Sequence, residues 1–343
     1  TGAEAGRFGQ VSWRIWVASG GQRSEFELME APEVQAGEPY SKELRLLAHV
    51  LSAARAGDAE SVCAAVESFG EGTLPGTSHW LKVAGGVKAG LLAGAVQTAP
   101  QKGGLALEIG TYCGYSAVRI ATACSVHWRR ARGPVVVSLE VDAAHAVIAR
   151  CLLVFAGLAH LVEVMIGHSE DVLPWVIRSI QRKRRSQGPL FDTVFLDQRG
   201  SRYEADLDTL EQAGALSVGA VVVADNVLKP GAPLFLWRVT RGSYATEVFS
   251  VPEFAMSDVE DWMTASVYNP GWDQAAPIAP PIALRVLEWK AEQMRSRAHQ
   301  PDHGGSGIGF SEWAEFALQM RRDLSQAGFD AKPLRCKKSA TTS

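Results

Sequence analysis

The stretch GGLALEIGTYCGYSAVRIATA, residues 103–123, decides the fold class of this chain. An apolar run ends in Glu108, a turn with Gly110 and Gly114 follows, and the residues from Ser116 onward have the composition of a helix. Strand, glycine turn and helix form the first unit of a doubly wound α/β fold, which binds its ligands at the carboxyl ends of the strands. The stretch lacks the Gly-Lys-Ser/Thr of a phosphate loop and the third glycine of the dinucleotide pattern.

Composition excludes several classes of protein. The chain has 343 residues, enough for one large domain or two, and its formal net charge of -3 gives no electrostatic reason to expect a nucleic-acid partner. The five cysteines include no Cys-x-x-Cys pair, which is typical of reduced thiols in a cytoplasmic compartment. The longest apolar stretch, residues 152–166, is interrupted by polar residues and is too short to span a bilayer, so we expect no membrane association.

The two ends of the chain differ in composition from its centre. Residues 1–40 predict a β-hairpin, because VSWRIWVA and EFELMEA alternate apolar and polar residues on either side of Gly20-Gly21. This hairpin is compatible with the tail of an upstream domain. Residues 273–343 begin with a Pro-rich linker and continue as a helical extension, with helices expected over 284–298 and 311–327. These helices carry apolar faces and are expected to pack on the central domain or on a partner.

Residues 41–272 are expected to form the central domain, an α/β doubly wound sheet with helices on both faces. Short apolar runs separated by amphipathic segments are typical of a parallel sheet that is buried on both sides. The predicted strands cover 105–109, 135–140, 161–166, 191–197 and 220–225, with 244–251 and 264–268 at the sheet edge. The predicted helices cover 41–56, 58–69, 83–96, 115–125, 142–156, 170–186 and 203–214.

Polar side chains follow four of the predicted strands at the point where each strand ends. These residues are Glu108, Glu140, Asp197 and the pair Asp225-Asn226. Glu140 is placed at a suitable distance after the glycine turn to accept hydrogen bonds from ribose hydroxyls. Two carboxylates and an amide from neighbouring strand ends form an all-oxygen donor set, which suits Mg²⁺ or Ca²⁺ and not zinc. Taken singly, an acidic residue after a strand is commonly a turn or helix cap, but four such ends in register favour a site.

Three sequence motifs carry a family resemblance. LEIGTYCGYSAVRIA, VFLD and VVVADNVLKPGAP closely resemble the catechol O-methyltransferase family, whose members depend on magnesium and S-adenosylmethionine. The resemblance runs from about Gly57 to about Tyr268 and leaves both ends of the chain outside it. It implies a Rossmann-like class I methyltransferase fold and transfer of the methyl group of S-adenosylmethionine to a hydroxyl of a metal-chelated catechol or similar vicinal diol.

The resemblance also assigns residues to the methyl donor. Most of them are expected around its methionine part, with Glu140 on the ribose, Val141 beside the adenine, and Ser169 and Glu170 at the adenine edge. The residues assigned to S-adenosylmethionine in this way are Ala84, Glu108, Gly110, Tyr112, Ser116, Glu140, Val141, Ser169, Glu170 and Asp197.

A second set is assigned to the metal and the acceptor. By resemblance Asp197, Asp225 and Asn226 hold Mg²⁺, and Asn226 also contacts the acceptor. Trp80 and Pro230 match positions that flank the aromatic substrate. Glu253 is a candidate for the acidic residue that holds the second hydroxyl.

The chain departs from the family where the general base is expected. The family motif His-Trp-Lys, whose lysine is the base, reads Gln198-Arg199-Gly200 here, and the family's methionine under the transferring methyl is Lys82. Lys82 and Arg199 are therefore the base candidates, and Lys82 is preferred because arginine rarely gives up its proton.

These departures leave three hypotheses open. The favoured one is a catechol-type O-methyltransferase, and the second is a methyltransferase with another small-molecule acceptor. The third is a non-catalytic protein that binds S-adenosylmethionine. The intact metal set of Asp197, Asp225 and Asn226 argues against the third, because a binding relic does not need a metal site.

Overall fold

An eight-stranded sheet organises the computed structural model of the chain. The structure describes residues 14–19, 22–27, 39–72, 81–100, 104–125, 133–271, 279–299 and 308–334. The sheet order is β10-β8-β9-β7-β6-β3-β4-β5, with β7, β6, β3, β4 and β5 parallel and with β9 antiparallel to both β7 and β8. Its strands are β3 (Leu105–Ile109), β4 (Val136–Glu140), β5 (Val162–Ile166), β6 (Phe191–Leu196), β7 (Leu216–Ala224), β8 (Tyr244–Glu253), β9 (Met256–Tyr268) and β10 (Lys332–Pro333).

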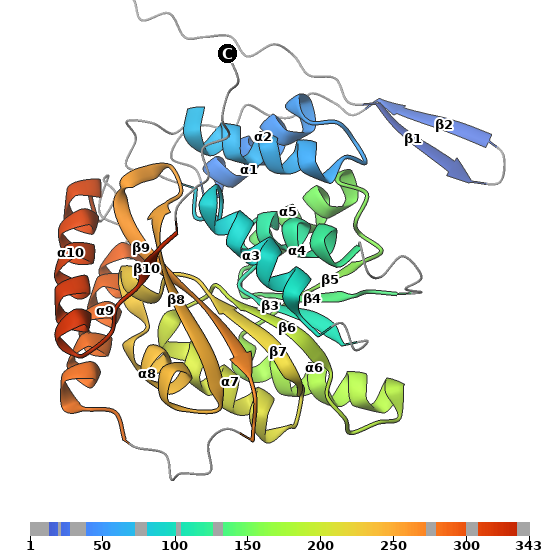
Figure 1. Cartoon of the computed structure of the whole chain (residues 1–343). Helices are drawn as coiled ribbons and strands as arrows, with labels where there is room; N and C mark the ends of the chain where they lie inside the picture. The colour runs from blue at the N-terminus through green and yellow to red at the C-terminus, as the bar shows by residue number, and fades with distance from the viewer. Residues whose placement is uncertain are drawn as a thin grey trace, which may run out of the picture.

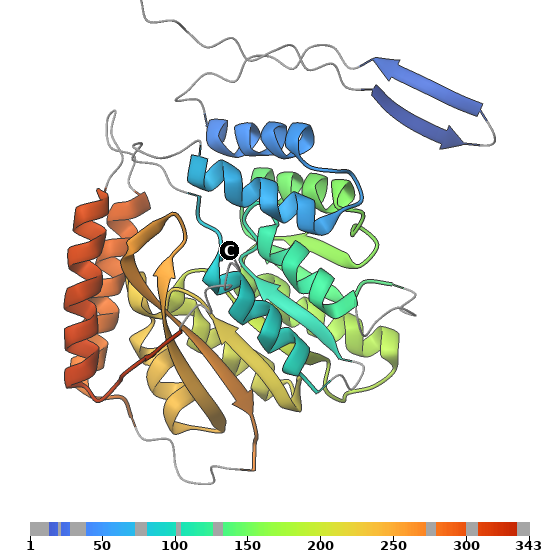
Figure 2. The ribbon, with the colours of Figure 1, turned by 45° about the horizontal axis from the view of Figure 1, so that its top comes forward.

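Helices cover both faces of this sheet (Figures 1 and 2). One face packs against α3 (Val87–Thr98), α4 (Tyr115–Ser125) and α5 (Ala143–Phe155), with α1 (Ser41–Ala53) and α2 (Ala59–Gly72) beyond them. The other face packs against α6 (Ser169–Arg184), α7 (Tyr203–Gln212) and α8 (Pro233–Arg241). Two short helical turns complete the second side, η1 (Gly200–Arg202) and η2 (Val227–Gly231). The predicted doubly wound sheet with helices on both faces is confirmed.

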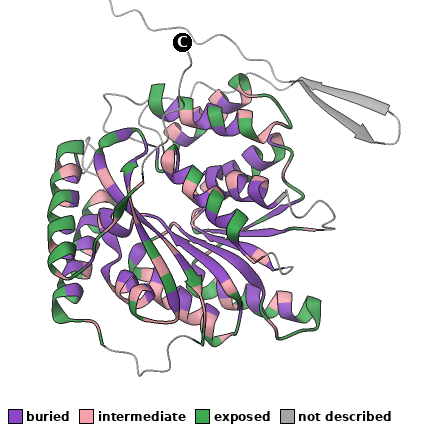
Figure 3. Cartoon of the chain, in the orientation of Figure 1, coloured by how far each residue is buried: buried purple, intermediate pink, exposed green. Residues whose placement is uncertain are grey.

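The central strands form because their side chains are mostly apolar and are covered on both faces of the sheet. All six residues of β6 are buried, and Figure 3 shows the burial concentrated in the sheet. Asp142 begins α5 by accepting hydrogen bonds from the amides of Ala144 and His145 at 2.8 and 3.2 Å, which satisfies helix amides that have no partner within the helix.

Three local predictions need correction. Helix α3 begins at Val87 and not at residue 83, because Gly86 has φ 58° and ψ -124°, a conformation outside the helical region. Strand β9 lies between β7 and β8 and not at the sheet edge, which is taken by the two-residue strand β10. Helix α8 was not predicted, since its nine residues follow a Pro-Gly loop that indicated only a turn.

The C-terminal helices α9 (Ile282–His299) and α10 (Phe310–Gln326) pack on the central domain (Figures 1 and 2). Their apolar residues join the core that lies between the sheet and α6 to α8. These residues are Leu284, Leu287 and Ala291 of α9 and Ala317, Met320 and Leu324 of α10. Of the two expected arrangements, packing on the central domain is therefore the one that the structure shows.

The predicted N-terminal hairpin is present as β1 (Arg14–Ser19) and β2 (Gln22–Glu27), paired antiparallel. Its second strand begins and ends earlier than the alternation of EFELMEA indicated. Among the described residues, none of the helices combines the length and the apolar character that crossing a bilayer requires.

Candidate active site

The sheet register brings the predicted strand ends together. Ile109 of β3 pairs with Leu196 of β6, and Leu196 pairs with Ala224 of β7. The next residues along β6 and β7 are Asp197 and Asp225, so the two carboxylates leave neighbouring strands at the same level. This edge is the carboxyl edge of the parallel strands, where a doubly wound sheet binds its ligands.

The glycine turn after β3 lies directly against the end of β6. Gly110 has φ +95°, and a Cβ on it would overlap the backbone carbonyl oxygen of Asp197. Gly114 has φ +90°, and a Cβ there would lie 2.9 Å from the Cα of Ala149. Both positions therefore require glycine for conformation and for space, and the turn holds β3 and its helix close to the candidate metal residues.

Two buried acids line the cofactor side of this edge. Glu108 is fully buried, accepts a hydrogen bond from the hydroxyl of Ser138, and has an Oε1 atom without a hydrogen-bond partner among the described residues. Burial raises the pKa of its carboxyl. Glu140 accepts the amide of Tyr112 at 2.7 Å on Oε2 and that of Asp142 at 3.0 Å on Oε1. The unpartnered oxygen of Glu108 fits a site that still lacks a hydrogen-bond donor, such as the amine of a bound amino acid.

The other residues assigned to the methyl donor lie along the same edge. Tyr112 lies within the glycine turn with φ 49°, and its hydroxyl donates to Glu43 of α1. Ala84 and Ser116 are buried, while Val141 is exposed. Ser169 at the start of α6 donates to Asp206 at 3.0 Å.

Glu170, which is also assigned to the methyl donor, interacts with another residue of the chain. Its carboxylate forms an ion pair with Arg202 at 3.1 Å. The structure therefore brings the assigned residues to one edge, with Val141 and Glu170 at its exposed margin.

The three candidate metal residues have different surroundings. No described residue forms a hydrogen bond or ion pair with the carboxylate of Asp197. Asp225 accepts the backbone amide of Asn226 at 2.8 Å and lies beside Lys88. Asn226 has φ 55° and donates its Nδ2 to Asp261 at 2.9 Å, which leaves its carbonyl oxygen as an acceptor.

A buried ammonium group connects three carboxylates near the end of β7. Lys88 of α3 has no exposed surface, and its Nζ lies 2.9 Å from Asp225, 3.1 Å from Glu253 and 2.8 Å from Asp261. Burial opposes this charge, but the carboxylates of Asp225, Asp261 and Glu253 more than offset it and raise the pKa of Lys88 well above its ordinary value. Lys229 pairs with the other oxygen of Glu253 at 2.8 Å.

The charges at this edge do not balance. Asp197, Asp225, Glu253 and Asp261 carry four negative charges when ionised, against the two positive charges of Lys88 and Lys229. Burial and the charge of Asp225 raise the pKa of Asp197 well above its ordinary value, and burial raises the pKa of Asp225 to about 6. Two crowded carboxylates and an amide oxygen are a hard donor set, and a divalent cation would supply the charge that keeps both carboxylates ionised.

Comparisons with known proteins identify the family. Residues 107–227 match the family model described as a methyltransferase domain. The chain is 37% identical over 230 residues to catechol O-methyltransferase of Bos taurus, which covers 67% of this chain and 77% of the bovine protein. It is 34% identical over 222 residues to catechol O-methyltransferase of Mus musculus, covering 65% and 76%. The chain belongs to the catechol O-methyltransferase family.

Membership in the catechol O-methyltransferase family makes this chain a methyltransferase. Among solved structures, the chain is similar to the O-methyltransferase from Bacillus cereus in complex with SAH. That likeness has 22% identity and a TM-score of 0.45, and it covers 66% of this chain and 91% of the other.

The base position of the catechol O-methyltransferase family is altered here. Gly200 lies in η1, and neighbouring Arg199 forms an ion pair with Glu292 of α9. Lys82 is exposed, and its pKa is lowered by partial desolvation and by the positive charge of Lys42. A lowered pKa favours Lys82 over Arg199 as the base, and that assignment stays a prediction.

Of the other residues that the resemblance assigns to the acceptor, Glu253 ends β8 and Pro230 lies in η2. Glu253 is buried, and Lys88 and Lys229 overcome the effect of burial and lower its pKa to about 2. Phe254 packs on the loop before α3, where a Cβ on Gly85 would lie 2.6 Å from its ring. Pro230 is half-buried in η2. Trp80 lies outside the described residues.

Sequence reasoning missed part of the charged network. Lys88 is the only charged residue of α3, and Asp261 stands in a buried stretch of β9. A charged residue in an apolar element is itself a signal, because burial of a charge requires a partner. The identity of the partners was not readable from the sequence.

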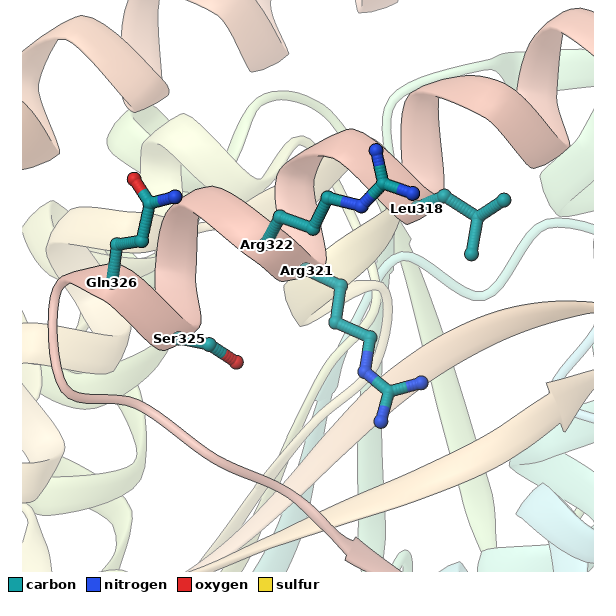
Figure 4. A pocket seen from close by; sticks show the side chains of 5 residues that line it. All are labelled: Leu318, Arg321, Arg322, Ser325 and Gln326. Carbon is teal, nitrogen blue, oxygen red and sulfur yellow. The ribbon is translucent and has the colours of Figure 1, made fainter.

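A separate hollow lies on the outer surface of α10 (Figure 4). It is lined by Leu318, Arg321, Arg322, Ser325 and Gln326, all from that helix. It shares no residue with the candidate site, and Arg321 pairs there with Glu260 of β9 at 2.8 Å. We assign it no role in the reaction.

Proposed function

We propose that the chain transfers the methyl group of S-adenosylmethionine to a hydroxyl of a catechol or similar vicinal diol, with Mg²⁺ held by Asp197, Asp225 and Asn226. The supporting observation is that two neighbouring strands end in the carboxylates of Asp197 and Asp225, which together with Glu253 and Asp261 would exceed the charge of Lys88 and Lys229 by two if all four were ionised. The names of the bovine and mouse relatives support the catechol as acceptor.

The cofactor side of the edge suits the methyl donor. Glu140 would accept the ribose hydroxyls, and Glu108, whose Oε1 has no partner among the described residues, would accept a donor from the methionine part. The backbone at Gly110 and the ring of Tyr112 would line the same pocket, with Ser169 toward the adenine. Tyr112 is held in place by its hydrogen bond to Glu43 and by His145, whose ring centroid lies 4.7 Å from its own.

The acceptor side must bind the diol and remove a proton. The cation, when bound, supplies positive charge that lowers the pKa of an acceptor hydroxyl. Glu253, which is ionised over the whole neutral range, would accept a hydrogen bond from the second hydroxyl, and Lys82 is the group available to take up the proton. Positioning and charge stabilisation would supply most of the rate.

One observation favours a second candidate function, methyl transfer to a different small-molecule acceptor. Arg199 stands where the family motif has an aromatic residue, and it forms an ion pair with Glu292 of α9, so this part of the site is charged. A non-catalytic role in binding S-adenosylmethionine is less well supported, because a protein that only binds this molecule would not need the metal residues Asp197, Asp225 and Asn226.

The deciding experiment is methyl transfer from labelled S-adenosylmethionine to a simple catechol, with Mg²⁺ and with chelator. We expect product only when the metal is present. Metal-dependent transfer to other acceptors, with none to catechols, would support the second function. Binding of S-adenosylmethionine without any transfer would point to a non-catalytic protein.

Replacing Glu140 with alanine is expected to weaken S-adenosylmethionine binding by about 1–3 kcal/mol, because ribose hydroxyls would lose their acceptor. Calorimetric titration measures the change in dissociation constant. The control is Glu163→Ala, which removes an exposed carboxylate from neighbouring β5. An unchanged dissociation constant in Glu140→Ala would remove this residue from the ribose role.

A further inference from the structure

Arg295 of α9 lies between two loops that begin at the candidate metal residues. One loop, residues 198–202, follows Asp197, and the other, residues 227–231, follows Asn226. Arg295 is 6% exposed, and its Nη2 donates to the backbone carbonyl oxygen of Gly231. A buried guanidinium at this place is unexpected for a helix that lies outside the family resemblance.

Gly200 and Arg295 fit each other sterically. A Cβ on Gly200 would lie 2.5 Å from Nη2 of Arg295 and 2.9 Å from the carbonyl oxygen of Gly231. A side chain at position 200 would therefore require the guanidinium of Arg295 and the carbonyl of Gly231 to shift. The space beside the backbone of Gly200 is occupied by the side chain of Arg295 from α9.

Glu292 connects the same helix to the first loop. Its carboxylate accepts hydrogen bonds from the guanidinium of Arg199 and, at 3.1 Å, from the hydroxyl of Ser201. It also forms an ion pair with Arg295 at 3.2 Å. Glu288, one turn earlier in α9, lies 3.6 Å from Arg295. The guanidinium is thus held by two carboxylates of α9 while it contacts both loops.

Helix α10 also contacts the second loop. Lys229 lies with its Nζ 5.3 Å from the ring centroid of Trp313, and its backbone amide donates to Asp261 at 2.9 Å. Trp313 is buried. The second loop therefore contacts both helices of the extension as well as the charged network around Lys88.

We propose that Arg295 is a positioning residue for the acceptor half of the site. It holds the loops 198–202 and 227–231 together, so that Asp197 on one side and Asp225-Asn226 on the other face a common ligand. Helices α9 and α10 are thereby part of the site. For the identity of that ligand, the inference rests on the proposed function.

The test compares Arg295→Ala and Arg295→Lys with a control from the same helix, Arg297→Ala. Arg297 is half exposed and pairs with Glu312 at 2.6 Å, away from both loops. Two binding constants are measured directly on each protein: that of Mn²⁺, by electron paramagnetic resonance, and that of S-adenosylmethionine, by calorimetry. Turnover is measured against acceptor concentration.

We expect Arg295→Ala to weaken Mn²⁺ binding and raise the acceptor KM by about tenfold or more, the order of effect of losing a charge-assisted hydrogen bond. The S-adenosylmethionine constant should stay unchanged. Added guanidinium should restore part of the loss in Arg295→Ala, and Arg295→Lys should be intermediate. Equal losses in cofactor and metal binding, or no loss in either, would overturn the proposal.

Hydrogen exchange separates this inference from the proposed function. Arg295→Ala is expected to speed exchange in residues 198–202 and 227–231 and to leave β3 and β4 unchanged. This readout needs neither metal nor acceptor. A wild-type protein that binds no Mn²⁺ would defeat the proposed function, whereas unchanged exchange in both loops would defeat the role of Arg295.

Discussion

Replacing Lys88 with methionine is expected to lower the free energy of unfolding by roughly 3–5 kcal/mol, the cost of leaving buried charges without their partner. Methionine is unbranched and close to lysine in size, but it lacks the terminal ammonium group and has a sulfur in place of Cδ. The carboxylates of Asp225, Glu253 and Asp261 would then lie together in the interior with Lys229 as the nearest remaining cation. Urea denaturation at neutral pH measures the change.

The pH dependence of this loss follows from Glu253. In the native protein its pKa is lowered to about 2, so the carboxylate contributes stability above the ordinary pKa of 4.5 and loses it as pH falls from there toward 2. Without Lys88 this contribution of Glu253 is smaller. The difference in the free energy of unfolding between variant and wild type should therefore be large at pH 7 and should shrink as the pH falls below about 4.5.

The matched control is Lys290→Met, which removes a half-exposed ammonium paired with Asp323 at 2.9 Å. Its effect should be about 0–1 kcal/mol, because solvent screens an exposed pair. Equal effects of the two substitutions would show that the Lys88 network contributes no more than a surface ion pair.

Replacing Asp225 with asparagine is expected to lower turnover by about 10²–10³-fold or more, the order of effect of removing one preorganised charge from an active site. The substitution keeps the shape of the side chain but removes a negative charge from the proposed metal site. Lys88 keeps Glu253 and Asp261 as partners, so the protein should remain folded. Because Asp225 lies on the acceptor side, S-adenosylmethionine binding should be largely intact.

Asp258→Asn serves as the control, because Asp258 is an exposed residue of β9 outside the charged network. Turnover with saturating Mg²⁺ and direct titration of Mn²⁺ are the two measurements. Full activity in Asp225→Asn would contradict the metal mechanism. A parallel loss of S-adenosylmethionine binding would show that the substitution disturbs the whole edge.

The parallel strands and the polar residues that follow them could be predicted from the sequence, whereas the places of β9 and β10 in the sheet could not. The run ending in Glu108 and the glycines at 110 and 114 are local signals, because strand, turn and helix form within about twenty residues. The carboxylates after β6 and β7 could be assigned to one edge because parallel neighbouring strands end on the same side. This inference needed no knowledge of how side chains pack.

The pairing of the charged residues around Lys88 can be seen only in the tertiary structure. Lys88 meets Glu253 at the end of β8 and Asp261 in the middle of β9, across sequence separations of 165 and 173 residues, and these contacts depend on how α3 packs against the two strands. Gly200 of η1 leaves the space that the side chain of Arg295 from α9 occupies, and the local sequence of neither residue indicates this contact. Periodicity reports which face of an element is buried, but the partner that covers it is chosen by the packing of the whole chain.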